Sequence, residues 1–530
     1  MPSTTAVLSA IPLVYFLYSR ARQAASRQAP LPPGPTKFPI VENLFHIPNG
    51  AFIWRDYTEM CKQYDSDIIH LSALGNSIII LNSKKAVSDL LEKKSAIYSG
   101  RPSTVMLGEL MGWGDAFIFR PNDDFWKAQR RIMNQAMPPT DPKRFHPKQL
   151  SATHDLLRVL PNSDDVMKSL QLWAAVFIMD VTYGIQGEEA EPYLPTVMAA
   201  LESMSIAGTP GAFYVDQIPL SSAFTVKYVP EWFPGAGFKR KAREWSELRK
   251  KMVEGPFSVA KERVAKGIAT PSLTSVALEQ MDPNQDTAYQ EQLIKTASVT
   301  AYGGGSDTTV AALGAFVIAM LENPHVQTIA HRELDKVLGP GDLPTFSDEP
   351  SLPYITAIVR EVLRYNPITP LAFPHQLVQD DIYEGYFLPK GSIIMPNVWL
   401  VALAPALFLE ARSITHNEKD YPEPDLFNPS RFLDSEGKLD PNVRDPANAT
   451  FGFGRRVCPG KHIATASLWI AVASILACYT IAPELDENGN EIPPNVQWYS
   501  GPTVFNHPLS FKCRFVPRSK DVERSLGVHV

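Results

Sequence analysis

Residues 451–460 decide the fold, and they read Phe451-Gly452-Phe453-Gly454-Arg455-Arg456-Val457-Cys458-Pro459-Gly460. A cysteine here lies in a glycine-rich, basic loop, directly before an apolar run over residues 463–478 that predicts a helix. Backbone N–H groups of such a loop and the positive end of the helix dipole both favour an ionised sulfur. The pattern therefore predicts a metal-bound or reactive thiolate at Cys458. A buried structural cysteine after a tight turn is the alternative.

Length and composition limit what the rest of the chain does. The 530 residues are 45% hydrophobic and 20% charged, which is enough apolar material for a large core. No linker, charge run or repeat divides residues 50–519, so one large domain is expected. A net charge of −6 without a clustered basic face argues against nucleic acid as a partner. The four cysteines lack metal-finger or secreted-domain spacing, which indicates a reducing compartment.

The N-terminus differs from the rest of the chain. Residues 4–18 are mostly apolar, Arg20, Arg22 and Arg27 follow, and a proline-rich stretch covers residues 30–35. This apolar stretch is shorter than the ~20 residues that a spanning helix requires. Because the basic residues follow it, we expect an uncleaved anchor over residues 1–19 and a rigid hinge over residues 20–35. A peripheral or disordered tail is the alternative.

Trp126 and Arg130 are four residues apart in an expected helix, so they share one face. An indole N–H and a guanidinium on one face are able to converge on a single carboxylate. Taken alone, the pattern is equally typical of a packing pair at the surface.

A long apolar helix is expected over residues 293–321, interrupted by the run Gly303-Gly304-Gly305-Ser306-Asp307-Thr308-Thr309. Each glycine in a helix costs roughly 1 kcal/mol relative to alanine, so the three predict that a flat group closely approaches the backbone. Asp307 and Thr308 place an acid and a hydroxyl at a helical distortion, where they are able to pass protons inward. An ordinary helix kink is the alternative.

Glu361 and Arg364 are three residues apart on a helix expected to begin after Pro353. An ordinary surface ion pair has the same spacing and contributes ~0 to 1 kcal/mol. Arg431 follows in a Pro-Ser-Arg-Phe run, and three prolines precede His375, which predicts a turn that enters a strand.

Five positions of the opening stretch, 451, 454, 456, 458 and 460, match the pattern Phe-x-x-Gly-x-Arg-x-Cys-x-Gly, through which the chain resembles the cytochrome P450 family. The resemblance covers residues 30–519, and its C-terminal part is similar to fungal P450s of the O-methylsterigmatocystin oxidoreductase type. It implies a mainly α fold with small β-sheets (α+β), with one haem domain over residues 36–519 and a tail over residues 520–530. The N-terminal order implies a single-pass protein of the endoplasmic reticulum membrane, with a cytosolic catalytic domain.

The resemblance also implies roles for single residues. Cys458 is the expected axial ligand of the iron of haem b (iron protoporphyrin IX), and Asp307 and Thr308 are the expected catalytic pair for proton delivery. Glu361, Arg364 and Arg431 are expected to form a buried structural triad. The expected haem-binding residues are Trp126, Arg130, His375, Phe451, Gly454, Arg456, Cys458 and Gly460. The expected pocket residues are Met106, Leu107, Tyr302, Leu371, Phe373 and Val504.

The implied activity is that of a haem-thiolate monooxygenase, which inserts one atom of O2 into an apolar small molecule, in secondary metabolism. The sequence offers no flavin or nicotinamide domain, so electrons are expected from NADPH through a separate cytochrome P450 reductase, with cytochrome b5 as an optional partner. A haem-thiolate isomerase or dehydratase is one alternative, against which Asp307 and Thr308 count. An inactive haem-binding protein is the other.

Two segments complete the expectations. The aromatic-rich stretch between breakers at residues 208–211 and 233–237 resembles the F–G region of the family, which is a lid over the access channel or a membrane-contacting surface. Residues 400–412 form an apolar insert where members of the family have almost none. Either a retained intron or a genuine extra helical turn explains this insert. Because it lies between Arg364 and Arg431 in the sequence, it is able to disturb the expected triad of Glu361, Arg364 and Arg431.

Overall fold

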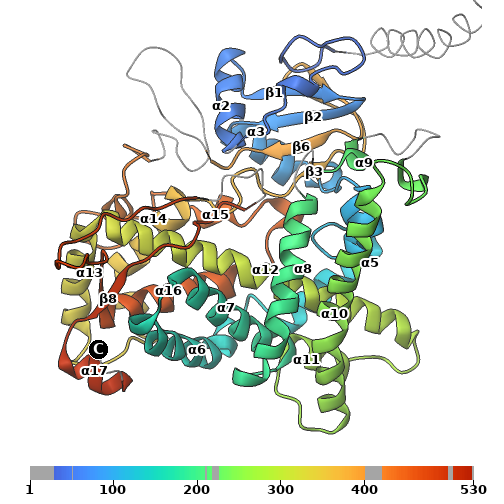
Figure 1. Ribbon diagram of the computed structural model, residues 1–530. Helices are drawn as coiled ribbons and strands as arrows, with labels where there is room; N and C mark the ends of the chain where they lie inside the picture. Colours follow the sequence, from blue (N-terminus) through green and yellow to red (C-terminus); the bar gives the residue numbers. More distant parts are fainter. Residues whose placement is uncertain are drawn as a thin grey trace, which may run out of the picture.

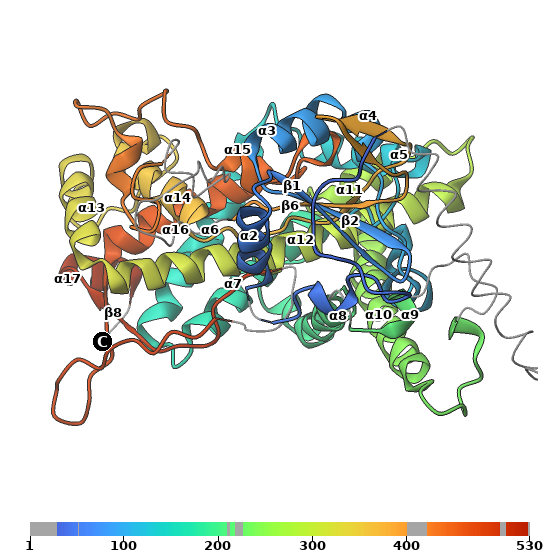
Figure 2. The same ribbon diagram turned by 90° about the horizontal axis from the view of Figure 1, so that it is seen from above.

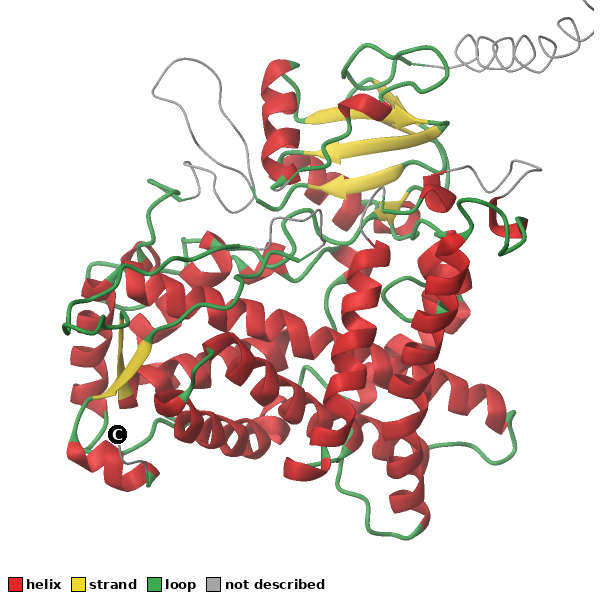
Figure 3. Ribbon diagram, in the orientation of Figure 1, coloured by secondary structure: helices red, strands yellow, loops and turns green. Residues whose placement is uncertain are grey.

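The computed structural model describes residues 29–50, 52–208, 212–217, 226–399, 421–498 and 505–527. Helices make up most of the described chain, and the strands form small sheets (Figures 1 and 3). The predicted mainly α fold with small β-sheets is therefore confirmed. The expected anchor at residues 1–19, Val504 and the insert at residues 400–412 lie outside the described residues.

The helices differ widely in length. The longer ones are α2 (Ile53–Gln63), α5 (Asp124–Ala136), α6 (His146–Val159), α7 (Val166–Tyr183), α8 (Leu194–Gly208), α10 (Gly237–Ala265), α12 (Thr287–Glu322), α13 (Pro324–Val337), α14 (Pro353–Tyr365) and α16 (Lys461–Cys478). The shorter ones are α3 (Lys84–Val87), α4 (Ser95–Tyr98), α9 (Tyr214–Gln217), α11 (Leu273–Glu279), α15 (Ala447–Thr450) and α17 (Lys520–Leu526). Single turns that bear on the site are η2 (Ser88–Lys93), η3 (Val105–Leu110), η4 (Trp113–Asp115), η11 (Pro429–Phe432) and η12 (Gly454–Arg456).

The largest sheet lies at one end of the molecule, at the top of Figure 1, beside α2 and above the helical body. Its strand order is β1 (Ile68–Ala73), β2 (Asn76–Leu81), β6 (Ile393–Pro396) and β3 (His375–Gln376). β2 and β6 are parallel, whereas β1 and β3 each run antiparallel to their neighbour. Two antiparallel pairs complete the strands, namely β4 (Asp381–Tyr383) with β5 (Tyr386–Leu388) and β7 (Tyr479–Ala482) with β8 (Arg514–Pro517).

Helix α12 crosses the whole helical body, as both views show (Figures 1 and 2). Every residue from Val310 to Leu321 is buried, because α7, α14 and α16 pack around this half of the helix. A helix that is apolar on all sides belongs in a core. Two helices, α12 and α16, are long and apolar enough to cross a membrane, but 72% of the most apolar 18-residue stretch of each is buried inside the protein. Interior packing thus explains their apolar composition.

Both ends of the described chain belong to the globular body. Within the expected hinge, the carbonyls of Pro30 and Pro33 accept hydrogen bonds from the N–H groups of Phe387 and His70 at 2.7 and 2.8 Å. These described residues of the expected hinge therefore lie against strands. Within the expected tail at residues 520–530, α17 forms and buries Val522 and Leu526 in the helical core.

Candidate active site

An internal cavity of about 260 Å³ brings together segments from most of the chain. It lies between α12, the start of α16, the residues after α14 and the segment around η4. Cys458 is part of its wall, as are Phe451, His375, Arg456 and Gly460 from the expected haem-binding set. The wall also includes Arg101, Trp113, Phe117, Gly304, Thr308, Thr369, Phe373 and Phe505.

The cysteine loop is folded by its own backbone. The Cys458 N–H donates to the Phe451 carbonyl at 2.8 Å, and the Arg456 N–H donates to the Phe453 carbonyl at 3.0 Å. Gly452 takes a φ of 83°, which a residue with a Cβ rarely adopts. Because α16 begins directly after Gly460, the thiol lies near the N-terminus of that helix.

The Cys458 thiol is open to the cavity, but surrounding protein atoms desolvate it. Burial raises the pKa of Cys458, whereas the Gly460 N–H and the charge of Arg130 act in the opposite direction. The loop N–H thus favours the ionised sulfur, as the sequence predicts, but burial outweighs it. A bound metal cation is what deprotonates a coordinating thiol in such surroundings.

Gly454 belongs to the matched pattern, but its small size serves the packing of η12 against η2. Its φ is 53°, and a Cβ at this position would lie 2.2 Å from the carbonyl oxygen of Leu91. Gly454 is absent from the described lining of the cavity. Its small size instead lets η12 approach η2.

Two arginines, Arg101 and Arg456, form a cationic cluster beside the cavity. The Arg101 Nη1 donates to the carbonyls of Phe373 and Pro374 at 2.8 and 2.7 Å. The Arg456 Nη2 donates to the Ser99 carbonyl at 2.7 Å. Burial, followed by the charge of Arg456, lowers the pKa of Arg101.

His375 lies beside this cluster and lines the same cavity. Its Nδ1 lies 2.7 Å from the Tyr98 carbonyl, so Nδ1 carries a proton and donates it. Burial and then the charge of Arg101 lower the pKa of His375 well below its ordinary value. Neighbouring main-chain carbonyls satisfy part of this positive charge, and no Asp or Glu occurs in the described lining.

Trp126 and Arg130 lie behind this wall on α5. The Trp126 ring is stacked on Phe117 at 5.1 Å between centroids, and its Nε1 is buried without a hydrogen-bond partner among the described residues. The Arg130 Nη1 donates to the Val457 carbonyl at 2.5 Å. The two side chains thus approach the cysteine loop, although neither is in the described lining.

These features fit a haem group. The buried guanidinium groups of Arg101 and Arg456 and the orphaned indole N–H suit the two carboxylates of a porphyrin, because a buried donor without a partner costs about 1 to 3 kcal/mol. The open thiol of Cys458 suits its iron. Gly304 adds space, since a Cβ there would meet nothing within 4 Å.

Helix α12 is continuous through the glycine run and contains the whole of the helix expected over residues 293–321. A Cβ on Gly305 would lie 2.5 Å from the Ile178 side chain of α7, and one on Gly303 would lie 3.0 Å from Leu201 of α8. Two of the three glycines therefore allow helices to pack closely. Only Gly304 faces open space in the cavity, as expected for close approach of a flat ligand.

Thr308 and Asp307 occupy different sides of α12. Thr308 lines the cavity, and its Oγ1 donates to the Gly304 carbonyl at 2.6 Å. Asp307 is not in the described lining, and burial raises its pKa, with the charge of His507 acting in the opposite direction. The acid thus lies behind the hydroxyl and holds a proton more readily than an exposed aspartate.

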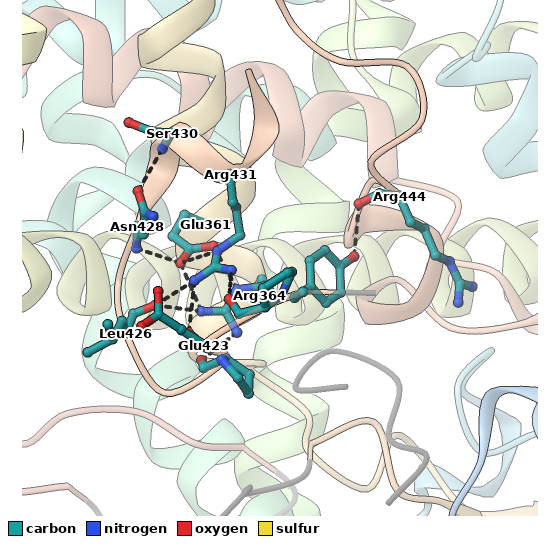
Figure 4. A network of polar contacts seen from close by, with 11 residues as sticks. Glu361, Arg364, Glu423, Leu426, Asn428, Ser430, Arg431 and Arg444 are labelled. Carbon is teal, nitrogen blue, oxygen red and sulfur yellow. Dashed lines mark hydrogen bonds and ion pairs between the residues drawn. The ribbon is translucent and has the colours of Figure 1, made fainter. Parts of the chain in front are cut away.

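Glu361, Arg364 and Arg431 meet in the core, as Figure 4 shows. Arg364 binds Glu361 with two hydrogen bonds of 2.7 and 2.8 Å, and both side chains are fully buried. The Arg431 Nε donates to the same carboxylate at 3.1 Å. Asn428 adds a backbone N–H at 2.7 Å. Arg431 and Asn428 reach this triad from the described stretch that begins at residue 421, after the segment that contains the insert.

Most of the expected pocket residues face elsewhere. Met106 and Leu107 are buried in η3, where the Met106 N–H donates to Asp216 at 2.8 Å. Tyr302 faces Tyr183 across 6.1 Å on another side of α12. Leu371 packs in a core cluster with Trp54 and Trp399. Phe373 does line the cavity, whereas Val504 lies outside the described residues.

Three residues of the site escape prediction from the sequence. Arg101 and Thr369 both line the cavity, but each lies in an irregular segment without periodicity. Phe505 lines it too and contacts Phe373 edge-to-face at 5.8 Å. The single signal in the sequence is the proline that follows each of Arg101 and Thr369 and favours an extended or turn conformation there.

Comparisons with known proteins agree with this site. The family model described as Cytochrome P450 matches residues 32–512. Cytochrome P450 monooxygenase 98 of Postia placenta is 56% identical over 502 residues, which cover 94% of this chain and 93% of the relative. Tryptamine 4-monooxygenase of Psilocybe cyanescens is 38% identical over 514 residues, with 96% and 97% coverage. Cytochrome P450 monooxygenase ple1 of Rhodocybe pseudopiperita is 37% identical over 520 residues, with 98% and 94% coverage.

The family match extends over nearly the whole described chain, and these relatives are fungal monooxygenases. The finer resemblance to the O-methylsterigmatocystin oxidoreductase type stays a prediction. The chain belongs to the cytochrome P450 family and is a P450 monooxygenase.

Proposed function

We propose that this monooxygenase inserts one atom of O2 into an apolar small molecule of secondary metabolism. The observation that carries the proposal is the cavity itself, which joins the Cys458 thiol to a mainly apolar wall. The relative named tryptamine 4-monooxygenase supports a small-molecule substrate. Haem iron bound to a thiolate supplies the oxidising chemistry that acts on carbon.

We propose that the Cys458 sulfur would be the axial ligand of the haem iron and that the cationic cluster would bind the carboxylates of the haem. Arg101, Arg456 and His375 would hold these carboxylates, and the Trp126 N–H would donate a hydrogen bond to them. In this arrangement, the haem carboxylates would balance the positive charge of Arg101 and Arg456 and would accept a hydrogen bond from the Trp126 N–H. Gly304 and Gly460 leave room for the flat ring.

Proton delivery is assigned to Thr308 and Asp307. The Thr308 hydroxyl lies on the cavity wall, so it is able to exchange protons with a bound ligand. Asp307 lies behind it, and burial raises the pKa of this carboxyl, which favours its protonated form relative to that of an exposed aspartate. The apolar wall excludes other water from the reacting atoms.

We further propose that NADPH supplies electrons through a separate P450 reductase, with cytochrome b5 as an optional partner, at the endoplasmic reticulum membrane. The order of the N-terminal segments, in which an apolar stretch is followed by arginines, supports a membrane anchor. Three aromatic side chains of the segment before α10 support membrane contact, because Tyr228, Trp232 and Phe233 are 76%, 79% and 50% exposed.

The test is full-length protein in membranes with added reductase. We expect a thiolate-type absorption band of the reduced carbon monoxide complex, and NADPH-dependent O2 consumption when a substrate shifts the haem spectrum. Turnover without NADPH and O2 would establish an isomerase or dehydratase instead. A normal band without turnover of any compound that shifts the spectrum would favour a binding protein.

A further inference from the structure

Three methionines lie on the wall of the cavity that holds the Cys458 thiol. They are Met133 of α5, Met137 directly after that helix, and Met204 of α8. The sulfur of a thioether takes up oxygen far more readily than the hydrocarbon groups that form most of this wall. The surroundings of each methionine therefore decide which of the three an oxidant is able to modify.

Burial separates these methionines. Met133 and Met137 are only 1% and 3% exposed, so protein atoms enclose both side chains. A sulfoxide needs room for an additional oxygen, and its polar S–O bond is costly in a closed apolar site. Met204 is half-buried, so part of its side chain is uncovered. Within the described lining, Met204 is thus the methionine best able to accept an oxygen atom.

Helical spacing places Met204 on the inner face of α8. It follows Val197 by seven residues and Leu201 by three, and both of these are buried. Residues at such spacings share one face of a helix. The outer face carries Met198 and Ile206, which are 43% and 39% exposed. Met204 therefore faces the body of the protein, whereas Met198 on the same helix faces away from it.

The inner face of α8 meets the part of α12 that borders the reacting atoms. Leu201 also lines the cavity, and a Cβ on Gly303 would lie 3.0 Å from its side chain. Gly304 and Thr308 line the same cavity. The Met204 side chain thus shares this space with the hydroxyl to which proton delivery is assigned.

The oxidant in question is hydrogen peroxide. A monooxygenase releases it when electrons and protons reach O2 without formation of product, which is uncoupled turnover. Reaction with a thioether breaks the O–O bond and forms one S–O bond. The sulfur loses two electrons and becomes a sulfoxide, while the second oxygen leaves as water with both protons of the peroxide. One peroxide molecule is consumed for each methionine that is modified.

We infer that Met204 is the site at which uncoupled turnover oxidises the protein, through peroxide that forms in the cavity and reacts before it escapes. The inference rests on the proposed function, because electrons must reach O2 in this cavity. The modification should increase with the amount of NADPH consumed. It adds a polar group to a mainly apolar wall.

The test uses full-length, haem-loaded protein in membranes with reductase, NADPH and O2, without an organic substrate and with catalase in the solution. Mass spectrometry of peptides measures the sulfoxide at each methionine. Because catalase removes peroxide only from the solution, Met204 is expected to carry about fivefold more sulfoxide than Met198, although Met198 is the more exposed of the two. Omission of NADPH should abolish this difference.

Two variants sharpen the test. Met204→Leu is expected to remove the main oxygen adduct from the mass of the intact protein, whereas the control Met198→Leu should keep it. Omission of catalase should raise the sulfoxide at Met198 and leave that at Met204 unchanged. As much sulfoxide at Met198 as at Met204, or suppression of the Met204 sulfoxide by catalase, would overturn the inference.

The reduced carbon monoxide spectrum of each variant shows whether its haem site is intact. Loss of that band in the wild type would contradict the proposed function. A normal band and NADPH-dependent O2 consumption without sulfoxide at Met204 would contradict this inference alone. Failure of the two proposals is therefore distinguishable.

Discussion

The guanidinium of Arg456 lies 4.4 Å from the ring centroid of Trp126, and Phe117 stacks on the same indole at 5.1 Å. Two contacts on one ring fix the direction of its N–H, which is buried and has no described partner. A donor held in this way is ready for a carboxylate that the polypeptide itself does not supply.

Replacing Trp126 tests this donor. Trp126→Phe keeps the stacked ring but removes the N–H, so we expect haem to dissociate about tenfold faster or more, as for the loss of a hydrogen bond to a charged group. Transfer of haem to apomyoglobin measures the rate. Trp173→Phe is the matched control, because its Nε1 is also buried without a described partner but lies in α7. Equal rates for both variants would contradict the assignment.

Cys458→Ala is expected to abolish the thiolate-type band of the reduced carbon monoxide complex, since the thiol on the cavity wall is lost. Absorption spectra of purified protein check this. Cys513→Ala, at a buried cysteine of the helical core, should keep the band. A band that survives in Cys458→Ala would mean that another group ligates the iron.

Thr308→Ala is expected to keep haem but to divert reducing equivalents to peroxide, because the cavity loses the hydroxyl assigned to proton delivery. The ratio of peroxide to NADPH consumed measures the effect. Thr309→Ala serves as control, since its hydroxyl makes the same type of bond to the helix backbone. If both variants couple NADPH to product as the wild type does, the assignment to Thr308 fails.

Glu361→Gln is expected to lower the free energy of unfolding by about 3 to 5 kcal/mol, because Arg364 and Arg431 are left as buried charges without a countercharge. Haem content should fall with it. Chemical unfolding followed by circular dichroism measures the change. Glu262→Gln breaks an exposed pair with Lys266 and should leave the unfolding midpoint unchanged. Similar midpoints for both variants would show that the triad does not stabilise the core.

Acid is expected to destabilise the protein partly through His331. Burial, and next the charge of Arg518, lower the pKa of His331 to about 4. Below its ordinary pKa of about 6.5 the unfolded chain binds this proton and the folded protein does not, so stability falls from there to about pH 4. Thermal midpoints of the wild type and His331→Asn, measured from pH 7 to pH 4.5, should converge as the pH falls. Parallel curves would exclude this contribution.

The sequence alone determined the features that depend on local spacing. The cysteine loop before α16, the pairing of Glu361 with Arg364 three residues later, and the apolar composition of α12 are properties of short segments. The period of a helix decides which residues share a face, and this period needs no knowledge of distant contacts.

The tertiary structure decided what depends on packing between distant segments. It placed Arg101 beside Arg456 and turned Tyr302 and Leu371 away from the cavity. It also put Ile178 against Gly305, so a glycine that suggests a ligand serves helix packing. Burial, which raises the pKa of Cys458, likewise depends on everything around the loop. A sequence pattern specifies the direction of a side chain relative to its own helix or strand, but only the assembled fold determines what lies in that direction.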